Sequence, residues 1–284
     1  MTLLLRASGA LLHVVPETGG ACAGWTWRGG LPVMRPASEA DLASGNPRRL
    51  GAFPLIPFSG RIADGRFVWQ GRTIQLPPNF PPEPHAIHGN AWQSAWAVAE
   101  QAEDRVLLTL DNAPNPAWPF PYRAGLGLHL LPDGLDVALH LRAGAEMPAG
   151  LGWHPFFHRG PGAALGFRAE RVWLADDRNI PESLALPEGA RRFDPARVLD
   201  AAAVDNCYEG WTRHAEPHPP GVRVSIEADP VFDHLVAYTP LGQPFFCAEP
   251  ATHAPNSINR PEGMRVLAAG EVLEGGIRLR LRAG

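Results

Sequence analysis

The stretch LGLHLLPDGLDVALHL, residues 126–141, decides the fold class of this chain. Apolar side chains occupy every second position in 126–130 and again in 135–141. Successive side chains of a β-strand point to opposite faces, so this spacing predicts two strands that each bury one face. The intervening Pro-Asp-Gly at 132–134 is typical of a turn, because proline presets φ and glycine tolerates a positive φ. The stretch is therefore predicted to form an antiparallel β-hairpin.

The same alternation recurs elsewhere in the chain. VRVSIEA at 222–228 and IRLRLRA at 277–283 each predict a strand with one buried and one wet face, and RFVWQGRTIQL at 66–76 predicts a second hairpin about Gln70-Gly71. The 31 Pro and 30 Gly residues interrupt the chain too often for long helices. Helices are expected only in short pieces, at 38–44 and in parts of 182–204, a region otherwise expected to be a long surface excursion.

These patterns favour an all-β fold. The chain contains no βαβ rhythm, no Gly/Ser linker and no internal repeat of about 20–50 residues. Many short strands of even spacing are typical of a large antiparallel β-sandwich with few short helices. We expect residues 1–284 to form one such domain, because all-β sandwiches of this length often fold as a single unit. A concave sheet in a sandwich of this size would offer a groove for a ligand.

Composition excludes several kinds of chemistry. Lys and Arg together number 25, and every one of them is Arg, so the chain has no lysine for a Schiff base, for pyridoxal phosphate or for a phosphate-binding loop. The sequence also lacks a nucleophile elbow and a dinucleotide-binding glycine pattern. Its three cysteines, Cys22, Cys207 and Cys247, are too few and too widely spaced for a disulfide framework or a zinc site of paired cysteines.

Charge and hydropathy point away from nucleic acid and membranes. The net charge is -4 and no block of like charge is present, so no nucleic-acid footprint is expected. No stretch approaches the roughly 20 apolar residues of a membrane span. The apolar N-terminal segment is interrupted by Arg6, His13 and Glu17 and has no basic leader, which makes it a poor signal peptide. A cytoplasmic protein is expected.

Several polar residues stand in apolar surroundings that suit a ligand site. Arg61 follows a Pro-rich apolar run and a Ser-Gly turn, and its guanidinium would suit sugar hydroxyls or a carboxylate. His85 and His88 have a spacing that could hold a metal on a helix, but Pro84 and Gly89 disfavour a helix there. On a strand the two imidazoles would point to opposite faces, so His88 is expected in a ligand-contacting loop.

Histidine and acidic residues supply candidates for proton transfer. His154 and His158 again have helical spacing, but Pro155 intervenes, and His154 alone is favoured as functional. Asp205 could belong to an ordinary Asx turn or accept hydrogen bonds from substrate hydroxyls. Glu249 follows the apolar run FFCA and precedes a proline, so we expect it at a strand end over a cleft, where it would serve as a general base. Taken singly, each residue also has a structural explanation, such as a hydrogen-bonded core histidine.

Five segments in a fixed order resemble the aldose 1-epimerase (galactose mutarotase) family. The resemblance extends from about residue 16 to about residue 267, and any one segment alone is a weak signal. The segments are IPFSGRI (56–62), HGNAWQ (88–93), PAGLGWHPFF (148–157), VDNCYEGW (204–211) and CAEPATHAPNSIN (247–259). The resemblance implies a galactose mutarotase-like supersandwich with a sugar bound in the groove of its concave sheet, acting as a monomer or homodimer without a metal or other cofactor.

The resemblance also assigns roles to residues. It implies that His154 is the catalytic acid and Glu249 the catalytic base, and that Arg61, His88 and Asp205 contact the sugar. On this view Glu249 takes the anomeric hydroxyl proton while His154 protonates the ring oxygen, and Asp205 would help to keep the imidazole charged if it lies close enough.

Aromatic side chains near these residues are expected to supply an apolar platform for a sugar face, the candidates being Trp153, Phe156 and Trp92. The sequence departs from the family at Ala251, where many members have glutamine, and at Asn90, where many have glycine. Both departures lie beside the expected pocket, so they bear on sugar preference.

Three alternatives remain open from sequence. A hexose-6-phosphate 1-epimerase would need extra cations, for which Arg48, Arg49 and Arg66 are the candidates. A non-catalytic sugar-binding protein would share the fold without the activity. A metal-dependent enzyme would use the histidines as ligands, namely His85, His88, His154 and His158.

Overall fold

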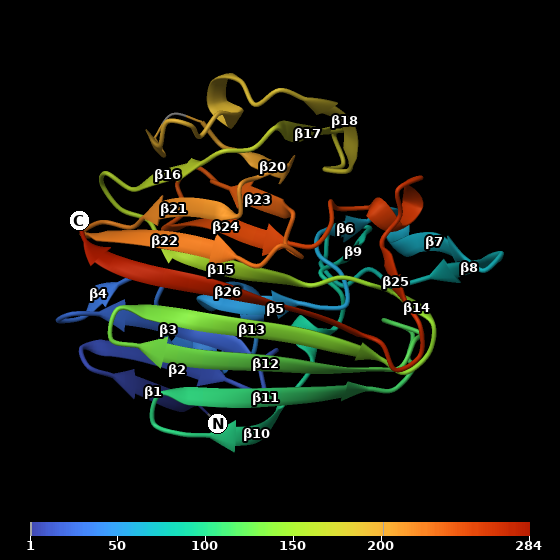
Figure 1. Cartoon of the computed structure of the whole chain (residues 1–284), viewed down its shortest axis with the longest axis horizontal. Coiled ribbons are helices and arrows are strands. Elements are labelled where there is room, and N and C mark those ends of the chain that lie inside the picture. Colours follow the sequence, from blue (N-terminus) through green and yellow to red (C-terminus); the bar gives the residue numbers. More distant parts are fainter. Residues whose placement is uncertain (1, 201) are drawn as a thin grey trace.

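The computed structural model describes residues 2–200 and 202–284 and contains two large sheets that pack face to face (Figure 1). Strand pairing within the sheets is antiparallel, which confirms the predicted all-β sandwich. The 11-stranded sheet has the order β1 (Leu3–Ala7), β2 (Ala10–Val15), β3 (Ala21–Trp27), β5 (Ala52–Leu55), β15 (Gly152–His158), β24 (Phe245–Ala251), β23 (His234–Tyr238), β20 (Asp205–Glu209), β17 (Arg171–Ala175) and β18 (Pro181–Ala185), with β4 (Leu31–Pro32) beside β3.

The second large sheet lies across the core from the first. Its nine strands have the order β10 (Ala97–Gln101), β11 (Arg105–Asn112), β12 (Tyr122–Leu131), β13 (Gly134–Ala143), β26 (Val272–Ala283), β22 (Val222–Ala228), β21 (His214–His218), β16 (Ala164–Phe167) and β19 (Arg197–Val198). The remaining strands form three two-stranded sheets: β6 (Arg61–Ile62) with β9 (Ala86–Ile87), β7 (Arg66–Trp69) with β8 (Arg72–Gln75), and β14 (Met147–Ala149) with β25 (Arg265–Leu267).

The hairpin at 126–141 forms as predicted, as strands β12 and β13. Its register pairs Leu131 with Gly134 across the turn and Leu128 with Val137 further along. Every leucine and valine expected on the inner face of this hairpin is at most 1% exposed. The second predicted hairpin also forms, as β7 and β8, with Gln70 and Gly71 both at positive φ in the turn.

The core lies between the two large sheets. One apolar cluster takes side chains from both, for example Leu126 and Leu139 of the 9-stranded sheet and Trp25 and Trp153 of the 11-stranded sheet. The C-terminal strand β26 contributes Ile277, Leu279 and Leu281 to this cluster, which confirms the alternation expected there. Residues that point the other way from the 11-stranded sheet are therefore free to form a site on its outer face.

Helical structure is limited to short pieces. The helix expected at 38–44 is α1 (Glu39–Ala43), whose Ser38 and Asp41 form a capping box. Within 182–204 the described residues form strands β18 and β19 and a single 3₁₀ turn, so the helices expected there are mostly absent from the described part of the chain. The 3₁₀ turns are η1 (Pro47–Arg49), η2 (Ala63–Gly65), η3 (Ala91–Gln93), η4 (Gly189–Arg191) and η5 (Ser257–Asn259). In residues 2–200 and 202–284, no helix has the length and apolar character needed to cross a membrane.

Candidate active site

A pocket opens on the outer face of the 11-stranded sheet, and its floor is one row of cross-strand neighbours. The pairing of Gly152 with Ala251 and of Phe156 with Cys247 places His154 opposite Glu249. The row crosses five strands, β5, β15, β24, β23 and β20, and consists of Phe53, His154, Glu249, Val236 and Cys207. Because side chains alternate along each strand, all five point to the same face, and all five line the pocket.

His154 and Glu249 form the central pair of this row. Nε2 of His154 lies 3.3 Å from Oε1 of Glu249, and the two side chains are only 9% and 3% exposed. The sequence prediction that Glu249 stands at a strand end is wrong, because β24 continues through Pro250 to Ala251. A proline φ is compatible with extended backbone, so Pro250 does not end the strand. The pair therefore sits within rigid sheet rather than on a loop.

Burial acts on the two members of the pair in opposite directions. It raises the pKa of Glu249 well above its ordinary 4.5, the charge of Asp205 raises it further, and Arg61 opposes the shift. Burial also lowers the pKa of His154 well below its ordinary 6.5, and His88 and Arg35 lower it further. Removing a charge from water disfavours the charged form of either group. Burial of the pair therefore favours a neutral carboxyl and a neutral imidazole, with one proton held between them.

His88 reaches the pocket from the loop between β9 and η3. Its Nδ1 accepts a hydrogen bond from the Gly60 backbone N–H at 3.1 Å, so the neutral ring carries its proton on Nε2. Burial, reinforced by Arg61 and Arg48, lowers the pKa of His88 to about 3, which keeps the ring neutral. His88 lies edge to face against His154, with ring centroids 5.4 Å apart. A neutral imidazole with a free Nε2–H is a hydrogen-bond donor to a ligand oxygen.

The backbone around His88 depends on the glycine that follows it. Gly89 has a φ of +71°, and a Cβ at this position would lie 2.1 Å from the carbonyl oxygen of Ile56. Only glycine permits both this conformation and this approach of two backbones. The backbone path that presents the His88 imidazole to the pocket therefore requires glycine at position 89.

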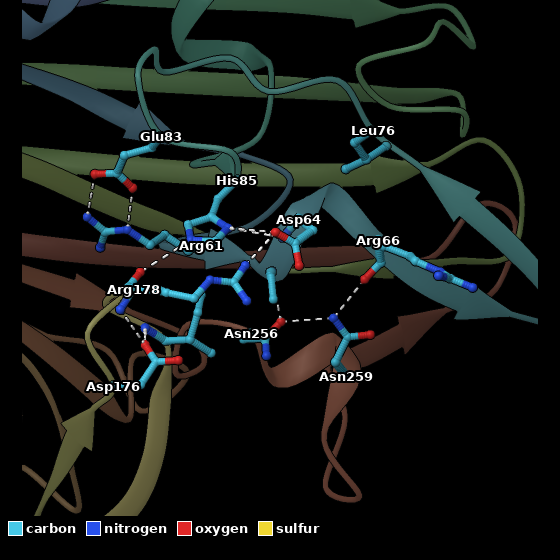
Figure 2. A network of polar contacts seen from close by, with 12 residues as sticks. Arg61, Asp64, Arg66, Leu76, Glu83, His85, Asp176, Arg178, Asn256 and Asn259 are labelled. Atoms are coloured by element: carbon cyan, nitrogen blue, oxygen red, sulfur yellow. Dashed lines mark hydrogen bonds and ion pairs between the residues drawn. The ribbon is translucent and has the colours of Figure 1, made fainter.

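Arg61 is held at the pocket wall by a carboxylate that the sequence analysis did not identify. Its Nε and Nη2 atoms donate to the two oxygens of Glu83 at 2.7 and 2.9 Å (Figure 2). The remaining Nη1 lies 4.0 Å from Oδ2 of Asp205. This two-point contact fixes the plane of the guanidinium and leaves Nη1 available to a ligand. No local sequence signal distinguishes Glu83 from other acidic residues in proline-rich loops.

Asp205 lies beside Arg61, as the first residue of β20, and not in the Asx turn considered from sequence. Its side chain is 38% exposed. The expectation that it sustains a charged His154 is not met, since its charge acts on Arg61 and Glu249 instead. Asp205 and Arg61 thus stand side by side at the pocket as an acceptor and a donor.

A polar network braces the wall that carries Arg61 (Figure 2). Asp64 accepts a hydrogen bond from Arg178, and Asp64 donates its backbone N–H to Nδ1 of His85 at 3.0 Å. Nε2 of His85 lies 3.2 Å from the carbonyl oxygen of Arg178. Asn256 accepts from the backbone N–H of Ala63 at 3.1 Å. These contacts join the segment after Arg61 to the β17–β18 turn and to the loop after β24.

The apolar part of the pocket comes from phenylalanine rather than from Trp153. The ring of Phe156 stacks on His154 with centroids 4.3 Å apart and lines the pocket. Trp153 is fully buried in the core between the sheets, so its predicted contact with the ligand is wrong. Adjacent residues of a strand point to opposite faces, and Trp153 and His154 cannot both face the pocket. Trp92 lies behind the pocket, stacked on Phe53.

The four histidines considered as metal ligands do not converge. Both ring nitrogens of His85 are used in the network described above. Among residues 2–200 and 202–284, a different set brings three possible ligand atoms together, namely His154, Cys247 and Glu249, whose ligand atoms lie within 4.8 Å of one another. This set includes the central pair of the pocket.

Sequence comparisons relate this chain to one protein family and to two proteins of Escherichia coli. The aldose 1-epimerase family profile matches residues 1–280. The uncharacterized protein YphB of Escherichia coli K12 is 32% identical over 301 residues, covering 99% of each chain, and the uncharacterized protein YihR of the same organism is 25% identical over 233 residues, covering 76% of this chain and 74% of its own.

Solved structures with the same fold span the whole chain. A crystal structure from Escherichia coli K12, provisionally named as an aldose 1-epimerase, superposes with a TM-score of 0.89 at 28% identity and covers 100% of this chain and 99% of its own. A galactose mutarotase-like protein of Clostridium acetobutylicum has a TM-score of 0.87 at 21% identity, covering 100% and 95% of the two chains. These structures confirm the predicted mutarotase-like sandwich.

Proposed function

Because the chain belongs to the aldose 1-epimerase family, we propose that it is a mutarotase that interconverts the α and β anomers of a hexose. Family membership itself implies an isomerase that acts on a sugar. The observation that carries the finer proposal is the His154–Glu249 pair on the pocket floor, 3.3 Å apart and shielded from water. A pair that shares one proton is suited to moving protons between two oxygens of a bound ligand.

Ring opening of a hexose needs one proton to leave the anomeric hydroxyl and one to reach the ring oxygen. The carboxylate of Glu249 accepts the hydroxyl proton, and Nε2–H of His154 donates its proton to the ring oxygen as the bond from that oxygen to C1 breaks. The open-chain aldehyde rotates about the C1–C2 bond. The C5 hydroxyl, formed when the ring oxygen took its proton, then attacks the other face of the aldehyde. His154 recovers the proton of that hydroxyl and Glu249 returns its proton to the aldehyde oxygen, so the pair ends as it began.

The sugar itself completes the required protonation state. Burial by itself favours a neutral carboxyl and a neutral imidazole. A hydroxyl that donates to Glu249 and a ring oxygen that accepts from His154 both favour the alternative placement of the same proton. Each positioned acid or base typically accelerates a reaction by about 10²–10⁴-fold, which suffices for a reaction that already proceeds slowly in water.

The remaining polar groups of the pocket orient the sugar. His88 offers an Nε2–H donor, Arg61 offers Nη1, and Asp205 beside it offers carboxylate oxygens. Phe156 and Phe245 also line the pocket and suit the apolar face of a pyranose. Donors and acceptors in one partly apolar pocket favour a neutral, polyhydroxylated ligand.

Polarimetry of purified variants tests the proposal. His154→Asn and Glu249→Gln should each abolish the accelerated interconversion of glucose or galactose anomers. His158→Asn is the matched control, since His158 ends the same strand β15 on the same face but does not line the pocket. A near-wild-type rate in folded His154→Asn or Glu249→Gln would refute the assignment of these residues as acid and base. Sugar binding without any acceleration in the wild-type protein would identify a binding protein instead.

A sugar phosphate is the second candidate substrate, favoured by Arg48. This arginine lines the pocket and stacks on Phe80, with Cζ 3.3 Å from the ring centroid. The other two expected phosphate ligands are not placed for this role, because Arg49 pairs with Asp41 and neither Arg49 nor Arg66 lines the pocket. Competition between glucose and glucose 6-phosphate discriminates the two, and a preference for the phosphate that disappears in Arg48→Gln would favour the second.

A further inference from the structure

A buried thiol lies beside the pair formed by His154 and Glu249. Cys247 is two residues before Glu249 on β24 and therefore points to the same face of the sheet. It is fully buried, and the three residues Cys247, Glu249 and His154 place one possible ligand atom each within 4.8 Å of one another. Neither proton transfer in the mutarotation described above uses this sulfur.

The three groups are those that bind zinc-like ions. Imidazole nitrogen, thiolate sulfur and carboxylate oxygen bind Zn²⁺ at about 2.0–2.3 Å, and three protein ligands with one open position are common in accessible zinc sites. On that basis the ligand atoms of a tetrahedral site with one sulfur lie about 3.3–3.5 Å apart, so the cluster needs to contract by about 1.3 Å at most. The thiolate selects soft cations over Mg²⁺ and Ca²⁺.

We propose that His154, Cys247 and Glu249 form a binding site for a soft divalent cation such as Zn²⁺ or Cd²⁺, which occupies the pocket floor in place of the sugar. The fourth coordination position faces the pocket, since His154 and Glu249 both line it. A thiolate and a carboxylate together offset the two charges of the cation. Arg35 lies close enough to favour the thiolate form of Cys247, although its own charge opposes that of the cation.

Cation and sugar exclude each other at this site. A bound cation takes up the Glu249 oxygen and the His154 nitrogen, the two atoms that would move protons in the mutarotase reaction. The inhibitory consequence therefore rests on the proposed function, whereas cation binding does not.

Titration of the whole protein with CdCl₂ tests the site without turnover. The ultraviolet thiolate-to-cadmium charge-transfer band should appear in the wild-type protein and be absent from Cys247→Ala, with binding weakened by more than about tenfold by loss of one of three ligands. Cys22→Ala is the matched control, because Cys22 is equally buried in the same sheet and belongs to no such cluster among the described residues. Cys247→Ser serves if the alanine variant does not fold.

A missing band in the wild-type protein, or a band that persists in folded Cys247→Ala, would overturn the proposal. Added galactose or glucose should raise the cadmium concentration needed for half-saturation, and an unchanged midpoint at saturating sugar would overturn the competition. Cadmium binding by a wild-type protein that shows no polarimetric activity would refute the mutarotase assignment alone and leave the cation site standing.

Discussion

Nε2 of His154 lies 3.3 Å from Oε1 of Glu249, and the register of β15 and β24 places the two residues directly opposite each other. Two interior positions of neighbouring strands give the pair a fixed separation that no loop movement alters. Each strand is hydrogen-bonded on both sides, to β5 and to β23 respectively. The geometry on which the proposed proton transfer rests is thus a property of the sheet.

Asp205→Asn should move the pH profile of kcat/KM for mutarotation to lower pH. The charge of Asp205 raises the pKa of Glu249, so it favours protonation of the pair. Removing that charge makes the pair's last proton easier to lose and its second proton harder to gain, and both limbs therefore shift in the same direction. Because the Asp205 side chain is partly exposed, solvent and salt screen part of this shift.

Asp111→Asn is the control for this profile. Asp111 lies on β11 in the other sheet, its side chain is 75% exposed, and its substitution makes the same change in net charge. Its profile should coincide with that of the wild-type protein. An Asp205→Asn profile that moves to higher pH, or that matches the control, contradicts the electrostatic role given to Asp205.

Glu83→Gln should raise KM for the sugar with a smaller effect on kcat. The substitution removes one of two charge-assisted hydrogen bonds to Arg61 and leaves the guanidinium free to turn toward Asp205. Loss of about 1.5 kcal/mol of positioning corresponds to roughly a tenfold rise in KM. Steady-state kinetics measures both constants, with Glu182→Gln on the exposed face of β18 as the control.

A specific result would contradict the proposal that Glu83 positions Arg61. If Glu83 only stabilised the fold, Glu83→Gln would lower the melting temperature while KM stayed at the wild-type value. If Glu83 positions Arg61, Arg61→Gln should raise KM at least as far, and the double variant should add little to it, because both substitutions disrupt one contact.

The sequence predicted the hairpins because alternation and turn chemistry are local. It also proposed His154, Glu249, His88, Arg61 and Asp205 as site residues, and the structure brings these five around one pocket, while their roles stay predictions. The prediction that Trp153 contacts the ligand was wrong. Strand geometry explains this, because a strand that presents His154 to the pocket must turn its neighbour toward the core. Glu83 and Cys247 could not be recognised, because their significance depends on contacts between segments far apart in the chain.

Gly89→Ala should destabilise the protein by about 2–4 kcal/mol. A Cβ at this position would lie 2.1 Å from the carbonyl oxygen of Ile56, which is backbone and cannot rotate away, and φ is +71°. Urea denaturation measures the loss. Gly71→Ala is the matched control, since Gly71 also has a positive φ but no atom lies within 4 Å of its Cβ position. Equal losses in the two variants would mean that the close approach at Gly89 carries no cost.

Stability should fall in acid through a buried histidine beneath the pocket wall. Nδ1 of His253 lies 2.8 Å from the carbonyl oxygen of Ala254 and donates to it, while Nε2 accepts from the backbone N–H of Ser59 at 3.2 Å. A second proton would face that N–H, and burial lowers the pKa of His253 from 6.5 to about 4. Its contribution to stability is complete above pH 6.5 and is lost as the pH falls toward 4, because the unfolded chain binds the proton first.

The expected loss from His253 alone is on the order of 3 kcal/mol over that interval. The His253→Gln variant has no titrating group at this position, so its free energy of unfolding should fall less steeply with decreasing pH than that of the wild-type protein. The difference in the free energy of unfolding between the two proteins should therefore narrow as the pH falls. Urea denaturation at a series of pH values between 7 and 4 measures both slopes. His13→Gln, at an exposed position of β2, should keep the wild-type slope. Parallel loss of stability in His253→Gln and the wild-type protein would show that other groups account for the acid sensitivity.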